Sequence, residues 1–153
     1  MKLLLQVTIV LAIVLSYFLI DYNAIYNSLR GEGEFVLQDK NCNLKESACQ
    51  VTIQDGTLFE LEVTPKEIPL MKPLTFTLKS SNQELKDLKL HIYSTNMMMG
   101  DYELPFTHMG NGVYKATGLL PTCPVGGMKW NADLEVGKIN KIIGARFQFE
   151  TDI

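Results

Sequence analysis

The chain has 153 residues, of which 14 are basic and 17 are acidic, so its formal net charge is −3. This length suffices for one domain and a short appendage. A mildly acidic chain without a basic stripe argues against nucleic-acid binding, because that binding depends on neutralising phosphates.

The N-terminal segment is a candidate membrane anchor. Residues 3–20 carry no charge, and a helix of that length would span roughly 27 Å, close to the hydrocarbon thickness of a bilayer. A cleaved secretory signal is the alternative, since its apolar region runs about 7–15 residues and ends in small residues. Bulky Tyr22, close to the end of the apolar run, favours the uncleaved anchor.

Charge around this segment predicts its orientation. Lys2 precedes the apolar run, and the first basic residue after it, Arg30, is offset by nearby carboxylates. The positive-inside rule then places the N-terminus in the cytoplasm and the rest of the chain outside. We therefore expect an inner-membrane anchor at 1–20, a tether at 21–33, and a domain at 34–153 that faces the periplasm.

Two neighbouring cysteines predict a disulfide. Cys42 and Cys49 are separated by six mostly polar residues, and in an oxidising compartment such a pair is expected to be bridged. A redox or metal-binding role for this pair is the alternative. Cys123 is then left over, and its role stays open between a buried inert thiol, a metal ligand and a redox group.

Beyond residue 33 the pattern is that of successive short strands. An Asp-Gly pair at 55–56 predicts a hairpin, and prolines at 65, 69 and 73 favour an extended crossover. Residues 137–138 suit a second hairpin turn, and 81–87 suit a short helical turn. Regular spacing with turns between the runs predicts an all-β, antiparallel β-sandwich. The expected strands are 35–37, 49–53, 57–63, 74–78, 88–93, 113–117, 128–136 and 142–149.

Methionines give the domain its most distinctive chemistry. Met97, Met98 and Met99 stand together in a polar stretch that ends at Gly100. Thioethers are soft ligands that suit Cu(I), whereas the structural alternative is that methionine fills gaps in a core. Alternation continued from the strand at 88–93 places Met98 on the core face and the other two methionines outside.

Three further segments add candidate ligands. His108 and Met109 precede a glycine-rich turn and are expected to be exposed, while Cys123 and Met128 belong to a second loop-like stretch. The expected Cu(I) ligands are therefore, in order of preference, Met97, Met99, His108 and Met109, followed by Cys123 and Met128.

Other metals and catalysis fit the sequence less well. Structural zinc needs four clustered cysteines or histidines, and calcium needs clustered carboxylates. A blue-copper loop would need a histidine between Cys123 and Met128, and 124–127 has none. Cys123 also lacks the second cysteine of a redox motif, and a nucleophilic pair would require His91 or His108 beside it. We therefore do not expect an enzyme.

Several motifs follow one another within residues 94–136. They are Asn-Met-Met-Met-Gly, His-Met-Gly, Gly-Val-Tyr-Lys-Ala and Cys-x4-Met-x-Trp. In these motifs the chain resembles the small exported domains called YtkA-like and FixH-like. The resemblance maps the Met-rich stretch of that family to 97–99, its His-Met turn to 108–109 and its Gly-x-Met-x-Trp to 126–130.

This resemblance implies an Ig-like β-sandwich, often membrane-tethered, with a role in copper handling and in the assembly of haem-copper respiratory oxidases. The small number of histidines in this chain disfavours Cu(II) and leaves Cu(I). We thus expect a tethered protein that passes Cu(I) to a copper-accepting protein or membrane complex. The alternative is a metal-free interaction module whose methionines form an adaptable contact patch beside a membrane complex.

Overall fold

The computed structural model divides the chain into two compact units, residues 1–32 and 33–153. It describes residues 33–152 apart from 98, 123–125 and 139–140, and in the first unit only residues 6, 7, 9–11 and 16, all helical. In the described part of the chain, no helix combines the length and apolar character needed to cross a membrane. Most of the predicted transmembrane helix at 1–20, like the tether at 21–33, lies outside the described residues.

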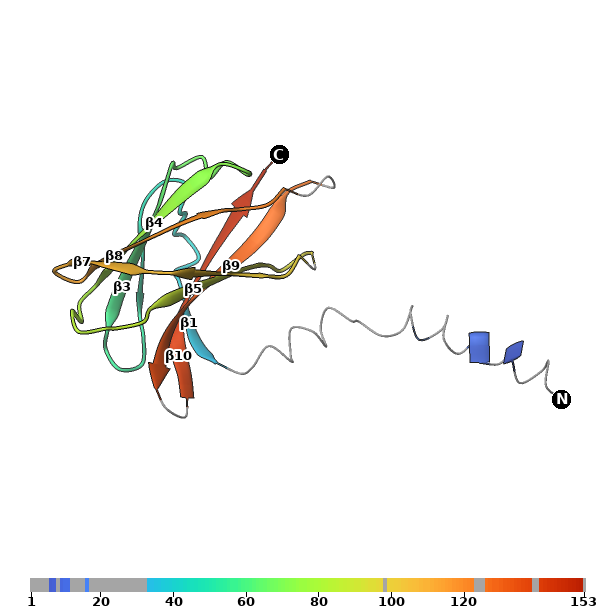
Figure 1. Ribbon diagram of the computed structural model, residues 1–153, viewed down its shortest axis with the longest axis horizontal. Coiled ribbons are helices and arrows are strands. Elements are labelled where there is room, and N and C mark those ends of the chain that lie inside the picture. Colours follow the sequence, from blue (N-terminus) through green and yellow to red (C-terminus); the bar gives the residue numbers. More distant parts are fainter. Residues whose placement is uncertain are drawn as a thin grey trace. The chain divides into compact units, whose positions relative to one another are not determined.

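The second unit is a β-sandwich, which confirms the predicted all-β class (Figure 1). Its strands are β1 (Glu34–Leu37), β2 (Cys49–Thr52), β3 (Leu58–Thr64), β4 (Pro73–Ser80), β5 (Lys89–Ser94), β6 (Asp101–Pro105), β7 (Thr107–Gly110), β8 (Val113–Leu119), β9 (Met128–Lys138) and β10 (Lys141–Thr151). They form two five-stranded sheets in the orders β1-β10-β9-β5-β6 and β2-β3-β4-β8-β7, here called the β9 sheet and the β4 sheet.

Strand pairing agrees with the hairpin predictions and departs from a purely antiparallel arrangement. β2 and β3 form the hairpin expected at 55–56, and Gly56 there adopts a φ of 84°. β9 and β10 also pair as the second expected hairpin, but the turn predicted at 137–138 is wrong, because Gly137 and Lys138 belong to β9 and pair with Ile142 and Lys141. β1 pairs with β10 in parallel, unlike the other pairs of described strands.

Two strands, β6 and β7, were not predicted from the sequence. β6 and β7 lie at the edges of their sheets, and none of their residues is fully buried. A strand without a buried face does not need apolar residues at every second position, so its sequence lacks the pattern that identifies a strand. Pro105 at the end of β6 and Gly110 at the end of β7 are also more typical of turns than of strands. His108 and Met109 are exposed, as predicted, but they lie in β7 rather than in a loop. The stretch 81–87 forms turns rather than a short helix.

The core lies between the two sheets. Its largest side chains are Trp130 from β9, Phe147 from β10, and Phe59 and Phe76 from the β4 sheet, all buried. The indole N–H of Trp130 donates to the Thr151 hydroxyl at 2.9 Å, so this buried donor has a partner. Alternation along each strand places the polar neighbours of these residues on the outer faces.

The predicted disulfide between Cys42 and Cys49 is present, with a Cα–Cα distance of 5.7 Å. It closes the loop that joins β1 to β2, and Leu44 within that loop is buried in the core. By the loop-entropy argument, a closed loop this short contributes roughly 2–3 kcal/mol of stability.

Candidate functional site

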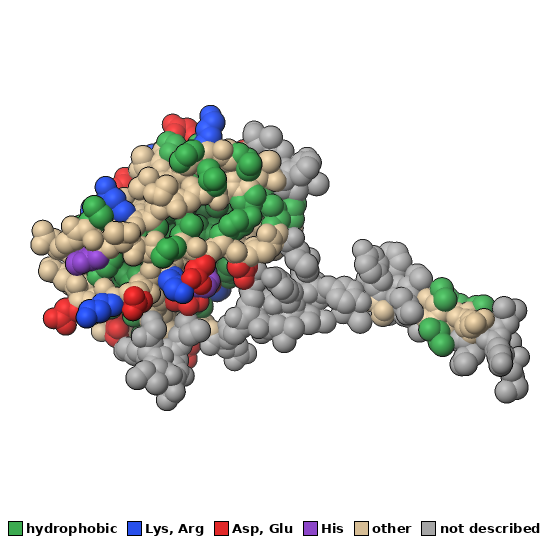
Figure 2. Space-filling view, viewed as in Figure 1, with side chains coloured by type: hydrophobic (Ala, Val, Ile, Leu, Met, Phe, Trp, Pro, Cys, Tyr) green, Lys and Arg blue, Asp and Glu red, His purple; other side chains and the backbone are tan. Residues whose placement is uncertain are grey.

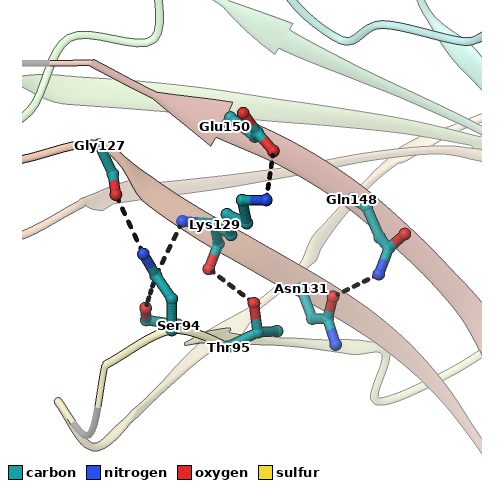
Figure 3. Close-up of polar contacts among 8 residues, drawn as sticks. Ser94, Thr95, Gly127, Lys129, Asn131, Gln148 and Glu150 are labelled. Atoms are coloured by element: carbon teal, nitrogen blue, oxygen red, sulfur yellow. Dashed lines mark hydrogen bonds and ion pairs between the residues drawn. The ribbon is translucent and has the colours of Figure 1, made fainter.

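The methionine-bearing loop, residues 95–100, joins β5 to β6 and is fixed to the start of β9. The side-chain amide of Asn96 donates to the Gly127 carbonyl at 3.0 Å and accepts from the Lys129 backbone N–H at 3.1 Å. The Thr95 backbone N–H donates to the Lys129 carbonyl at 2.9 Å. The Thr95 hydroxyl donates to the same carbonyl at 3.4 Å (Figure 3). These bonds hold the loop against both neighbours of Met128.

Met97 and Met99 are partly buried and pack against the core, so the prediction that they point outward is wrong. β5 ends at Ser94, whose hydroxyl donates to the Asn96 side chain, and strand alternation therefore stops before the methionines. Met98, predicted on the core face, lies outside the described residues. Met128, at the start of β9, is fully buried.

His108 and Met109 lie far from these methionines. β6, whose five residues extend over roughly 17 Å, separates the methionine loop from β7. His108 pairs with Tyr114 at the start of β8, and the two rings lie 4.7 Å apart between centroids. β8 then runs back along the sheet, and Figure 1 shows β7 at the left end of this unit.

The structure thus divides the predicted ligands between two ends of the sandwich. It brings the loop carrying Met97 and Met99 to the start of β9, where Met128 lies. His108 and Met109 are at the other end, and Met109 is 58% exposed. Cys123 falls outside the described residues. Within the described chain, no group of three histidine, cysteine or acidic side chains is arranged to hold a metal ion.

Sequence reasoning missed a charged cluster around His91 on the outer face of β5. Its Nε2 lies 3.5 Å from Glu103 and 3.6 Å from Glu135, while the Lys89 ammonium lies 2.6 Å from Glu103. The hydrogen bond from Lys89 lowers the pKa of Glu103, and the same bond raises the pKa of Lys89. Lys89 already neutralises the Glu103 carboxylate, so these side chains form a chain of ion pairs rather than an open metal site.

A second missed feature is a polar network buried on the outer face of the β9 sheet. Arg146 contacts both carboxylate oxygens of Asp133 at 2.7 Å, and the Tyr93 hydroxyl donates to the same carboxylate at 3.1 Å. Burial raises the pKa of Tyr93, and the hydrogen bonds to Asp133 raise the pKa of Arg146. Asp133 is only 5% exposed. Alternation on β9 places it on an outer face but gives no sign of this burial.

Comparisons with protein-family models, with curated proteins and with solved structures found no match to this chain.

Proposed function

We propose that the protein is a non-enzymatic Cu(I)-binding or copper-transfer protein, whose metal site lies where the methionine loop meets the start of β9. The observation that carries this proposal is the pair of Asn96 hydrogen bonds to Gly127 and Lys129. They hold the segment containing Met97 and Met99 beside the segment containing Met128. Thioethers are ligands that select Cu(I).

The surroundings suit a metal that must be held and then passed on. Met97 and Met99 are partly buried against apolar side chains, which limits water around a bound ion. Thioethers are uncharged, so the ion can leave by ligand exchange to a copper-accepting protein that offers thiolates. Cys123 precedes Met128 by five positions, and we include its thiol as a further candidate ligand.

We also propose that the protein is anchored in the inner membrane and that its β-sandwich lies in the periplasm. The uncharged run at 3–20 supports an anchor in the inner membrane with the β-sandwich in the periplasm. The Cys42–Cys49 disulfide supports an oxidising compartment, because such bonds are rare where thiols are kept reduced. We also retain, as a proposal, the relation to the Ig-like YtkA and FixH domains and a role in respiratory-oxidase assembly.

The test is anaerobic titration of the full chain with Cu(I) against a competing chelator. A double variant, Met97→Leu with Met99→Leu, removes two thioethers at nearly constant volume. Met109→Leu is the matched control, since Met109 is exposed at the opposite end of the sandwich. Tight binding that is lost in the double variant and kept in the control supports the proposal. Equal affinity in both variants would exclude this site.

A metal-free interaction module is the second candidate. Met71, Met109 and Leu119 are 63%, 58% and 54% exposed, respectively. Figure 2 shows hydrophobic side chains gathered among polar ones on the visible face of the sandwich. Exposed methionines adapt readily to different contact surfaces. Failure of the full chain to bind Cu(I) would favour this candidate, whose partner is a protein of a membrane complex.

A further inference from the structure

Met71 is a strongly exposed methionine that the proposed copper site does not include. It lies in the connection between β3 and β4, and its relative exposure is 63%. Its φ of 57° falls in the left-handed region, which residues other than glycine seldom adopt. Such a conformation persists only where the surrounding structure fixes it. The backbone at Met71 is therefore held by its neighbours while the side chain remains accessible to solvent.

The contact that fixes Met71 is with the end of β8. The Met71 backbone N–H donates to the Leu120 carbonyl at 2.8 Å. Close by, Pro73 at the start of β4 pairs with Leu119, the last residue of β8. Leu120 directly follows β8 and is buried in the core. Met71 is thus attached at the point where the chain leaves the β4 sheet.

This point lies at the end of the sandwich that carries the methionine loop. β6 directly follows that loop, and its Leu104 packs against Gly118 near the end of β8. The contact is so close that a Cβ atom added at Gly118 would lie 2.7 Å from Leu104 Cδ1. From Leu120 the chain continues to Met128, the first residue of β9 in the opposite sheet. Facing sheets lie about 10 Å apart, so Met71 and the methionine loop share one end of the sandwich.

The methionines at this end differ in exposure. Met97 and Met99 are partly buried against the core, and Met128 is fully buried. A copper ion that they hold is shielded from a copper-accepting protein. Met71 offers the same soft thioether on an exposed side chain. The exposed Met109 cannot serve in this way, because it lies at the other end of the sandwich.

We infer that Met71 is the ligand through which Cu(I) enters and leaves the site at Met97, Met99 and Met128. This inference rests on the proposed copper-binding function and adds a route of exchange to it. In each transfer, a bond between the Met71 sulfur and Cu(I) forms as a bond to one of the inner methionines breaks. The metal remains Cu(I), and neither an electron nor a proton is transferred.

NMR of the full chain with ¹³C-labelled methionine methyl groups tests this route. The chain has seven methionines, and Cu(I) is diamagnetic, so each methyl signal can be followed during an anaerobic titration. The signals of Met71, Met97 and Met99 should all shift, whereas that of Met109 should stay in place. A Met71 signal that stays in place while those of Met97 and Met99 shift would overturn the inference and leave the copper site intact. If no signal shifts, the proposed function fails together with the inference.

Exchange kinetics separate an entry ligand from a holding ligand. Met71→Leu removes the thioether at nearly constant volume, and Met109→Leu is the matched control, because Met109 has a similar exposure of 58%. In Met71→Leu, stopped-flow transfer of Cu(I) to and from bicinchoninate should slow about tenfold in both directions, within the range of rate changes seen among variants of one binding surface. The affinity for Cu(I) should stay unchanged. Unchanged rates would overturn the inference, as would a lower affinity or an equal slowing in the control.

Discussion

Replacing Arg146 with methionine should destabilise the β-sandwich far more than the loss of an ordinary surface ion pair. Arg146 makes two 2.7 Å contacts to Asp133, whose side chain is only 7% exposed, and its guanidinium also lies 5.0 Å from the centre of the Phe35 ring. Removing one partner of a buried pair leaves an uncompensated charge and costs about 3–5 kcal/mol. The Tyr93 hydroxyl alone cannot compensate that charge.

Urea denaturation followed by circular dichroism measures this loss. With an m-value of about 2 kcal/mol per molar urea, the midpoint should fall by roughly 2 M. Lys79→Met is the matched control: Lys79 also lies 2.7 Å from its carboxylate partner, but its side chain is 59% exposed, and such pairs contribute about 0–1 kcal/mol.

Combining Arg146→Met with Asp133→Leu removes both charges together. Most of the lost stability should return, because the penalty arises from the unpaired carboxylate rather than from the missing attraction. If Arg146→Met costs no more than the Lys79 control, or if the double variant is less stable than the single one, the reasoning about burial at Asp133 is refuted.

Three further predictions concern other contacts. Reduction of the disulfide in the β1–β2 loop should cost roughly 2–3 kcal/mol in urea titrations with and without reductant. Thr151→Val leaves the buried indole N–H of Trp130 unpaired and should cost about 1–3 kcal/mol, measured by the same titration. The hydrogen bond from Lys79 lowers the pKa of Glu60 below its ordinary value of 4.5. The stabilisation that the charged Glu60 gives the fold is therefore complete above pH 4.5 and is lost as the pH falls through the folded-state pKa. The melting temperature of the native chain should exceed that of Glu60→Gln at neutral pH, and the difference should disappear in acid.

Much of the fold could be predicted because its central strands alternate strongly. The runs that became β3, β4 and β5 each have one fully buried face, and burial of one face is what produces alternation in a sequence. β6 and β7 have no such face, so the same reasoning could not find them. The disulfide could be predicted because Cys42 and Cys49 are close enough in sequence to close a short loop, and because the domain was expected in an oxidising compartment.

The sites depend on contacts that no local pattern records. Extending the alternation of β5 as far as Met99 failed because Asn96 bonds to a strand more than thirty positions away. Gln38 looks like an ordinary polar loop residue, yet it is buried, and its amide donates to the carbonyls of Cys42 and of Gln148, which is 110 positions away. Contacts between distant segments decide both features.

The bridge from Cys42 to the start of β2 also makes one part of the domain sensitive to the redox state of its surroundings. Cys42 supplies a carbonyl that accepts from the Gln38 amide, and the loop closed by its bond to Cys49 buries Leu44 in the core. Without the bridge, that loop is joined to the sandwich only through its two chain ends and non-covalent contacts. A reducing environment therefore loosens the attachment of this loop while the hydrogen bonds within the two sheets are unaffected.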